Sequence, residues 1–274
     1  MEKLFSSCPK LVYLSVRIVS VIAAFNFKVS APELKQLKII SYCPGPQFYV
    51  DAPKLENLDL FCSFPQPNFF LENAKYLVTA AVVLKKNYKL FLIRHAFPNS
   101  LNMLLAQISE VKYLSLSAPI PVDCCFPAFG NLTKLELVLD HYDYWKLLTV
   151  VLQKVPNLEY LSLEEKGIGD HEWSFNLPEV VPSCLSSHLK SIYMRKFKGR
   201  RSEMKMAEYL LKNGYLLNRF TICYTGVLDK KEELRKELFM FRRAITCSIL
   251  FLMSEDFLQG QKAYVDGFKT TLFD

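Results

Sequence analysis

Apolar residues recur along the chain in a fixed phase, as the pattern L-x-x-L-x-L with Val, Ile, Ala, Met or Phe in place of some leucines. Nine copies begin 21 to 34 residues apart, at Leu11, Leu34, Leu55, Leu77, Val111, Leu132, Leu158, Leu189 and Leu217. Most of these intervals lie in or near the roughly 20–29 residues of leucine-rich repeats. The pattern therefore predicts a chain of stacked repeats.

Each copy predicts one short strand of a parallel sheet. Alternate side chains of a strand face opposite ways, so the second and third apolar residues of the pattern point inward together. Stacked units bury this apolar face between a sheet on one side and helices or loops on the other. Proline stands two residues before several copies, where its fixed φ suits the turn into a strand: Pro9, Pro32, Pro53 and Pro156. We predict a right-handed α/β leucine-rich-repeat solenoid, or horseshoe, over residues 1–175.

Two of the longer intervals predict amphipathic helices. Residues 99–108 place Leu101, Leu104, Leu105 and Ile108 at the spacing of one helix face. Residues 144–154 do the same with Trp145, Leu148, Val151 and Leu152. We interpret both apolar faces as core and not as a cofactor pocket.

Residues 176–252 predict a small module of the order βαβαβ that continues the sheet. Strands are expected at residues 189–194, 217–223 and 244–251. The first helix is expected to have Ser202 as its N-cap and to end at Asn213-Gly214. The second is expected to begin with a capping box of Asp229 and Glu232. Its inward-facing residues would be Leu234, Leu238 and Phe241. Residues 253–274 form a C-terminal tail.

The last third of the chain resembles the FBD domain, which in plants stands at the C-terminus of F-box/leucine-rich-repeat proteins. The matching stretches are Val181-Pro182-Ser183-Cys184-Leu185, Leu189-Lys190-Ser191-Ile192, Phe197-Lys198-Gly199-Arg200, Glu203 with Tyr209-Leu210-Leu211-Lys212-Asn213, and Cys247-Ser248-Ile249-Leu250-Phe251. The repeat Ala52-Pro53-Lys54-Leu55-Glu56-Asn57-Leu58 resembles the same family's repeats. The resemblance implies target recognition for a cullin–RING (SCF) ubiquitin ligase, with no catalysis by this chain.

Two features depart from the family pattern. The asparagine of L-x-x-L-x-L-x-x-N is replaced in the first seven copies by Val19, Tyr42, Ser63, Lys85, Pro119, Asp140 and Lys166, which favours an irregular horseshoe. The first repeat begins within ten residues of Met1, which leaves no room for an F-box. A Skp-type adaptor and cullin are therefore expected only if an F-box is supplied elsewhere. The alternative is a truncated family member that acts as a ligase-independent scaffold or has no function.

Composition and charge narrow the class of protein. Hydrophobic residues make up 51% of the chain and charged ones 22%, which predicts a real core and excludes disorder for most of it. Residues 1–175 carry a net charge of +1 and residues 176–274 one of +6. The basic run over residues 195–201 raises nucleic-acid binding as an alternative. It ranks far below protein binding, because Phe197 alone is no stacking platform.

Eight cysteines without a C-x-x-C pair predict reduced thiols and an intracellular location, in the nucleus or cytoplasm. The longest apolar stretch, residues 16–27, is interrupted by Arg17, Ser20 and Asn26 and is too short to predict a membrane span.

Patterns of catalytic chemistry are missing from the sequence. The only close glycine pair, Gly167-Ile168-Gly169, lacks the rest of a phosphate loop. The histidines His95, His141, His171 and His188 are scattered, and Cys124-Cys125 has no histidine at ligand spacing. We predict no enzyme activity, no cofactor and no metal site.

The variable positions of the strands are the candidate binding residues. We expect them to be exposed on the concave face and to bind a target protein. Tyrosine is enriched at protein interfaces, and the set contains four, although they could also simply cover the sheet. The residues are Tyr13, Ser15, Arg17, Lys38, Asp59, Tyr113, Ser115, Lys134, Glu136, Tyr160, Ser162, Glu164, Tyr193, Arg195 and Arg219.

Overall fold

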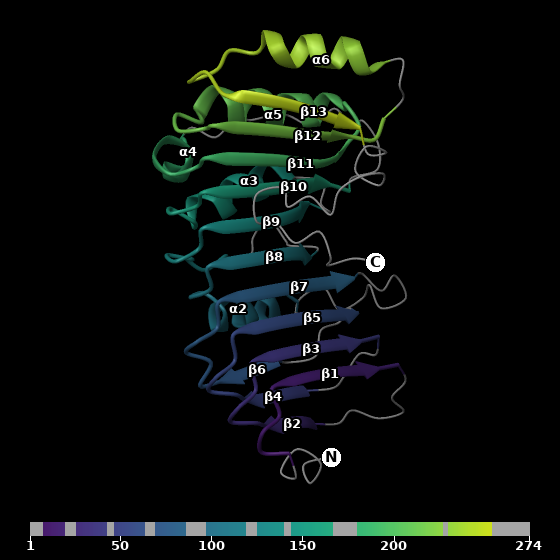
Figure 1. Cartoon of the computed structure of the whole chain (residues 1–274), viewed down its shortest axis with the longest axis vertical. Helices are drawn as coiled ribbons and strands as arrows, with labels where there is room; N and C mark the ends of the chain where they lie inside the picture. Colours follow the sequence, from purple (N-terminus) through teal and green to yellow (C-terminus); the bar gives the residue numbers. More distant parts are fainter. Residues whose placement is uncertain are drawn as a thin grey trace.

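A ten-stranded parallel sheet runs the length of the molecule (Figure 1). The computed structural model describes residues 8–19, 26–42, 47–63, 69–85, 97–118, 125–139, 144–166, 180–226 and 230–253. The strands of the sheet, in spatial order, are β1 (Tyr13–Ile18), β3 (Gln36–Ser41), β5 (Asn57–Ser63), β7 (Thr79–Lys85), β8 (Tyr113–Ala118), β9 (Lys134–Leu139), β10 (Tyr160–Glu165), β11 (Ser191–Phe197), β12 (Arg219–Tyr224) and β13 (Ser248–Met253). The nine repeat copies predicted from the sequence lie at the first nine of these strands.

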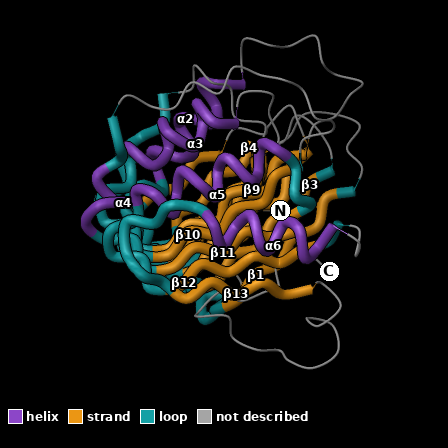
Figure 2. Tube along the Cα trace, turned by 90° about the horizontal axis from the view of Figure 1, so that it is seen from above, coloured by secondary structure: helices purple, strands orange, loops and turns teal. Residues whose placement is uncertain are grey.

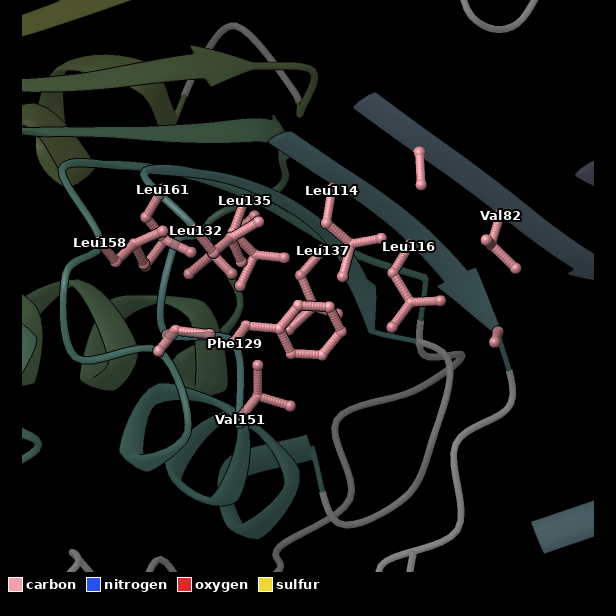
Figure 3. Packing of buried hydrophobic residues seen from close by; sticks show 14 of the residues in the cluster. Val82, Leu114, Leu116, Phe129, Leu132, Leu135, Leu137, Val151, Leu158 and Leu161 are labelled. Atoms are coloured by element: carbon pink, nitrogen blue, oxygen red, sulfur yellow. The ribbon is translucent and has the colours of Figure 1, made fainter. Parts of the chain in front are cut away.

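The repeat builds the core because equivalent apolar residues stand in register. The second apolar position of each copy faces that of the next strand, from Leu37 of β3 to Phe220 of β12, and each is at most 2% exposed. Figure 3 shows Leu135 and Leu137 of β9 beside Phe129 and Val151, which are buried in the same hydrophobic cluster.

The first leucine of several copies closes a turn into its strand. The Leu34 N–H donates to the Ala31 carbonyl at 3.2 Å, and the Leu55 N–H to the Ala52 carbonyl at 3.0 Å. Pro32 and Pro53 occupy the second position of these turns, where a φ near that of proline is required. The prolines noted in the sequence therefore serve the turn that positions each leucine.

A second parallel sheet lies behind the first three units, where we expected helices or loops. Its strands are β2 (Asn26–Ser30), β4 (Gln47–Asp51) and β6 (Phe69–Glu72). Phe27, Phe48 and Phe69 stand in register across it and are buried, with ring centroids 5.6 and 6.2 Å apart. The first three intervals, of 23, 21 and 22 residues, leave little room for a helix with two turns, and a short strand fits instead.

Helices cover the same side of the sheet in the later units: α2 (Phe97–Gln107), α3 (Tyr144–Gln153), α4 (Ser183–Ser187), α5 (Arg201–Asn213) and, at the end of the stack, α6 (Lys231–Met240). Figure 2 shows α2, α3 and α5 on one side of the strands. The Gln107 amide at the end of α2 joins the two kinds of layer, because its oxygen accepts from the Leu71 N–H of β6 and its Nε2 donates to the Phe69 carbonyl of the same strand at 3.0 Å. Both predicted amphipathic faces are core, although the Trp145 side chain lies outside the described residues.

Two predicted boundaries are wrong. Helix α5 has Arg200 and not Ser202 as its N-cap, because the Glu203 carboxylate accepts the Arg200 N–H at 2.9 Å and frees Ser202 to donate to Glu165. Strand β13 begins at Ser248, four residues later than expected.

Several features of the sequence lie outside the described residues. They are Asp229, the boundary at residues 175 and 176, the tail from residue 254, the glycine pair at 167–169, Cys124, His95, His141 and His171. Within the described part of the chain, no helix is long and apolar enough to cross a membrane.

Candidate partner-binding surface

The large sheet has one face on which no described helix packs, and we call it the helix-free face (Figure 2). Alternate residues of the strands lie on it in register and form three rows. The first row is Tyr13, Gln36, Asn57, Thr79, Tyr113, Lys134, Tyr160, Ser191, Arg219 and Ser248. The middle row is Ser15, Lys38, Asp59, Ala81, Ser115, Glu136, Ser162, Tyr193, Thr221 and Leu250. The third row runs Arg17, Ile40, Phe61, Val83, Ser117, Val138, Glu164 and Arg195.

All the candidate residues named from the sequence lie in these rows, but they are not all exposed. Toward the ends of the sheet, five candidates are exposed, with Tyr13 at 54%: Tyr13, Ser15, Arg17, Lys38 and Arg219. Those that are half-buried are Asp59, Tyr113, Lys134, Tyr160 and Arg195.

Five candidates are buried, contrary to the expectation: Ser115, Glu136, Ser162, Glu164 and Tyr193. Ser115 and Ser162 have short side chains in the middle row, between flanking rows on strands about 4.8 Å apart, and are 3% and 1% exposed. The two buried glutamates pair with basic side chains of β11: Glu136 with Arg195, two strands away, and Glu164 with Lys196 on the adjacent strand. These five residues therefore support the surface and offer little area to a partner.

An ion-pair cluster joins four strands of the helix-free face. Arg195 Nη1 of β11 lies 3.3 Å from Glu136 Oε2 of β9, and Lys196 Nζ lies 3.0 Å from Glu164 Oε1 of β10. Ser115 Oγ of β8 donates to Glu136 Oε2 at 3.3 Å. Arg195 Nε is 3.9 Å from Glu164 Oε2, which is attraction between charges without a hydrogen bond. We call Ser115, Glu136, Glu164, Arg195 and Lys196 the Arg195 cluster.

Burial, more than the charges of the cluster, changes the pKa of the two neighbouring tyrosines. Burial raises the pKa of the Tyr113 hydroxyl, and the charge and hydrogen bond of Glu136 raise it further. Burial also raises the pKa of Tyr193, with Cys223 adding to the shift. Both phenols are therefore neutral hydrogen-bonding groups near neutral pH.

Three first-row residues on neighbouring strands form a continuous aromatic and basic strip, which we call the Tyr113–Tyr160 strip. Lys134 stands in register between Tyr113 and Tyr160, and its Nζ lies 5.2 Å from the centroid of the Tyr160 ring. A cation at this distance is attracted to the ring face. The strip is half-buried, so it presents rigid and partly desolvated side chains, as interface anchors do.

Sequence reasoning missed an apolar part of this face. Ile40 and Phe61 are half-buried, Val83 is buried, and the Tyr42 ring lies 5.7 Å from that of Phe61. On the same ring, Lys85 Nζ lies 4.9 Å from the Phe61 centroid, as a cation over an aromatic face. The sequence signal for it was a pair of consecutive apolar residues in these strands, such as Leu60-Phe61 and Val82-Val83. A strand that is apolar on both faces does not alternate between apolar and polar residues.

The basic run over residues 195–201 is largely engaged in the fold. Arg200 Nη1 lies 3.4 Å from Glu165 Oε1, Phe197 is fully buried, and Gly199 takes a φ of +74° in the turn before α5. The buried Glu203 carboxylate accepts the N–H groups of Lys198 and Arg200. The run is thus a structural turn more than a free basic patch.

Among the described side chains, no group of three or more His, Cys, Asp and Glu residues is placed to hold a metal ion. The site that the geometry offers is a polar and aromatic surface along a parallel sheet.

These features define a class first: a mixed α/β repeat protein with a large parallel sheet and one helix-free face. The FBD family matches residues 177–222, which include β11 and α5. An F-box/FBD/LRR-repeat protein of Arabidopsis thaliana is 30% identical over 265 residues, which cover 90% of this chain and 56% of that protein. The chain belongs to the FBD-containing family of F-box/FBD/LRR-repeat proteins.

Two further Arabidopsis thaliana F-box/FBD/LRR-repeat proteins are similar over shorter stretches. The first of these is 35% identical over 145 residues, which cover 48% of this chain and 32% of that protein. The second is 30% identical over 171 residues, which cover 56% of this chain and 37% of that protein. The chain spans about half the length of the first relative and about a third of these two. No solved structure matches it.

Proposed function

We propose that this chain is a non-catalytic recognition module that binds a target protein on its helix-free face. The observation that carries the proposal is the Tyr113–Tyr160 strip, because aromatic side chains held rigidly on a sheet are typical anchors of protein interfaces. The names of the relatives include an F-box, which supports a role in target selection for a cullin–RING ubiquitin ligase.

The finer architecture is part of the same proposal. We infer that the large sheet is that of a right-handed leucine-rich-repeat solenoid over residues 1–175, continuous with an FBD-type module over residues 176–252. Strands β10 and β11 pair in register from Tyr160↔Ser191 to Glu164↔Arg195, which supports one uninterrupted sheet across the boundary. The order β11, α5, β12, α6, β13 supports the module.

Alanine substitution of the strip tests the proposal. Tyr113→Ala and Tyr160→Ala should each weaken capture of the partner protein by about 1 kcal/mol or more if they are anchors. Tyr76→Ala and Tyr215→Ala are matched controls, because these tyrosines are 66% and 55% exposed in turns that precede β7 and β12. Equal capture by all four variants would exclude the strip as the binding site.

The composition of the captured complex separates ligase function from the alternative. A Skp-type adaptor and a cullin among the captured proteins would support the ligase role. Other partners without ligase subunits, captured through the same face, would instead support a ligase-independent scaffold.

A further inference from the structure

The first row of the helix-free face carries basic and aromatic side chains and no acidic one. Its members from β8 to β12 are Tyr113, Lys134, Tyr160, Ser191 and Arg219, on five consecutive strands. The rest of the row contributes only Tyr13, Gln36, Asn57, Thr79 and Ser248. A ligand lying along this row therefore meets positive charge and tyrosine rings.

The acids of the helix-free face are withdrawn from solvent, whereas most of its bases are not. The Glu136 and Glu164 side chains are 4% and 8% exposed and are paired within the Arg195 cluster. The Lys196 side chain that covers Glu164 is 65% exposed. Arg17, Lys38, Lys85 and Arg219 are also exposed.

The balance of charge on this face is positive. Within the three rows, together with the two lysines whose ammonium groups contact them, seven basic residues stand against three acidic ones. The bases are Arg17, Lys38, Lys85, Lys134, Arg195, Lys196 and Arg219, and the acids are Asp59, Glu136 and Glu164. The acids are half-buried or buried, so the accessible part of the face is more positive than this count.

We infer that the partner presents an acidic protein segment to the first row of the helix-free face, between β8 and β12. This inference rests on the proposed function and specifies the chemistry of the target. Carboxylates of the segment would pair with Lys134 and Arg219, which lie three strands apart, or about 14 Å. Its apolar side chains would pack on Tyr113 and Tyr160.

Charge density favours a protein segment over nucleic acid. Ten strands about 4.8 Å apart span about 43 Å. Duplex DNA carries about 25 negative charges over that length and a single strand about 13. An excess of four basic residues is small beside either number. Phe61 and Tyr42 pack edge to face on each other near β3 and β5, at the end of the sheet away from Lys134 and Arg219. A short acidic segment matches the available charge.

Fluorescence anisotropy with three labelled probes tests the inference on the full chain. The first probe is a peptide in which glutamate alternates with leucine, the second has glutamine in place of glutamate, and the third is single-stranded oligothymidylate. The variant is Lys134→Glu with Arg219→Glu. The matched control, Lys75→Glu with Lys154→Glu, makes the same change of charge at exposed turns after β6 and α3. Unfolding midpoints confirm that both double variants are folded.

We expect the glutamate peptide to bind, to bind less as salt is raised, and to lose about tenfold or more in affinity in the Lys134/Arg219 variant but not in the control. If the glutamine peptide bound as tightly as the glutamate peptide, and Tyr113→Ala weakened its binding, the inference of an acidic partner would be overturned. The proposed function would still stand in that case. Preference for oligothymidylate that depends on Lys134 and Arg219 would overturn both. Failure of the glutamate peptide to bind at low salt would overturn the inference, while the partner-capture experiment would still decide the proposed function.

Discussion

Arg195 Nη1 on β11 lies 3.3 Å from Glu136 Oε2 on β9, so a single ion pair reaches across the intervening strand β10. Glu164 of β10 stands in register beside Arg195 and takes Lys196 as its own partner. The units of β9, β10 and β11 are thus joined on the helix-free face by charge as well as on the other face by leucine packing. This arrangement makes Arg195 the residue whose loss the fold should tolerate least on this face.

We predict that Arg195→Gln destabilises the protein by about 3–5 kcal/mol, because Glu136 and Glu164 would lose a positive partner while buried. Chemical denaturation measures the effect. Lys198→Gln is the control, since Lys198 lies in the same basic run and its side chain is exposed. A loss of stability no greater than that of Lys198→Gln would contradict the role given to Arg195.

The same cluster predicts a rescue. Arg195→Met together with Glu136→Leu and Glu164→Leu removes the three paired charges of the cluster at once, and apolar replacements of buried ion pairs are often neutral. We expect this triple variant to be more stable than Arg195→Gln alone. A triple variant less stable than the single one would show that the loss comes from packing and not from unpaired charge.

The stability of the fold should fall as the pH rises through the neutral range, because of Glu203. Burial raises the pKa of this carboxyl from 4.5 to about 7, and the nearby Glu165 charge adds to the shift, while hydrogen bonds from the Arg200 and Lys198 N–H groups oppose it. The folded state therefore holds a proton that the unfolded state has released. Stability is greatest below the unfolded pKa and is lost as the pH rises through about 7.

Glu203→Gln keeps an oxygen acceptor for both N–H groups and should abolish this dependence. Between about pH 5 and about pH 8, the free energy of unfolding of the native sequence should fall by roughly 2–3 kcal/mol relative to that of the variant. Glu208→Gln, at an exposed position of the same helix, should keep the native slope. Parallel pH profiles for the native protein and Glu203→Gln would refute the assignment.

Gly199 should not tolerate a side chain. It combines a φ of +74° with a Cβ position that would clash with the end of the Leu234 side chain, so an added methyl strains the turn and forces that side chain to move. We expect Gly199→Ala to destabilise the protein by about 1–3 kcal/mol. Gly130→Ala is the control, because nothing lies within 4 Å of its Cβ position. Thermal unfolding of both variants measures the difference, and equal midpoints would contradict the close packing.

The strands of the large sheet are predictable from sequence because burial selects them directly. One register position of the sheet is occupied by buried leucines, among them Leu37, Leu58, Leu114 and Leu135. The regular spacing of these leucines in the sequence therefore predicts where the strands lie. The family of the chain was also identified from its sequence, and the FBD match over residues 177–222 confirms it.

The layer behind the sheet and the burial of the site could not be read in the same way. Phe27 and Val29 alternate with polar residues over only five positions, which is too short a stretch to separate a strand from a loop. Glu136 and Glu164 are buried by Arg195 and Lys196, which lie 59 and 32 residues further along the chain. Pairing across such distances depends on register between strands, and the sequence pattern of one strand does not contain it.

Site-specific cross-linking tests the central claim, that the helix-free face binds a partner protein, most directly. A photoreactive phenylalanine analogue would replace Tyr113, Tyr160, Tyr76 or Tyr215, one at a time, in cells that express the chain. We predict that positions 113 and 160 cross-link to one and the same protein and that positions 76 and 215 do not. Cross-links to that protein from the two turn positions only, with none from the strip, would contradict the account.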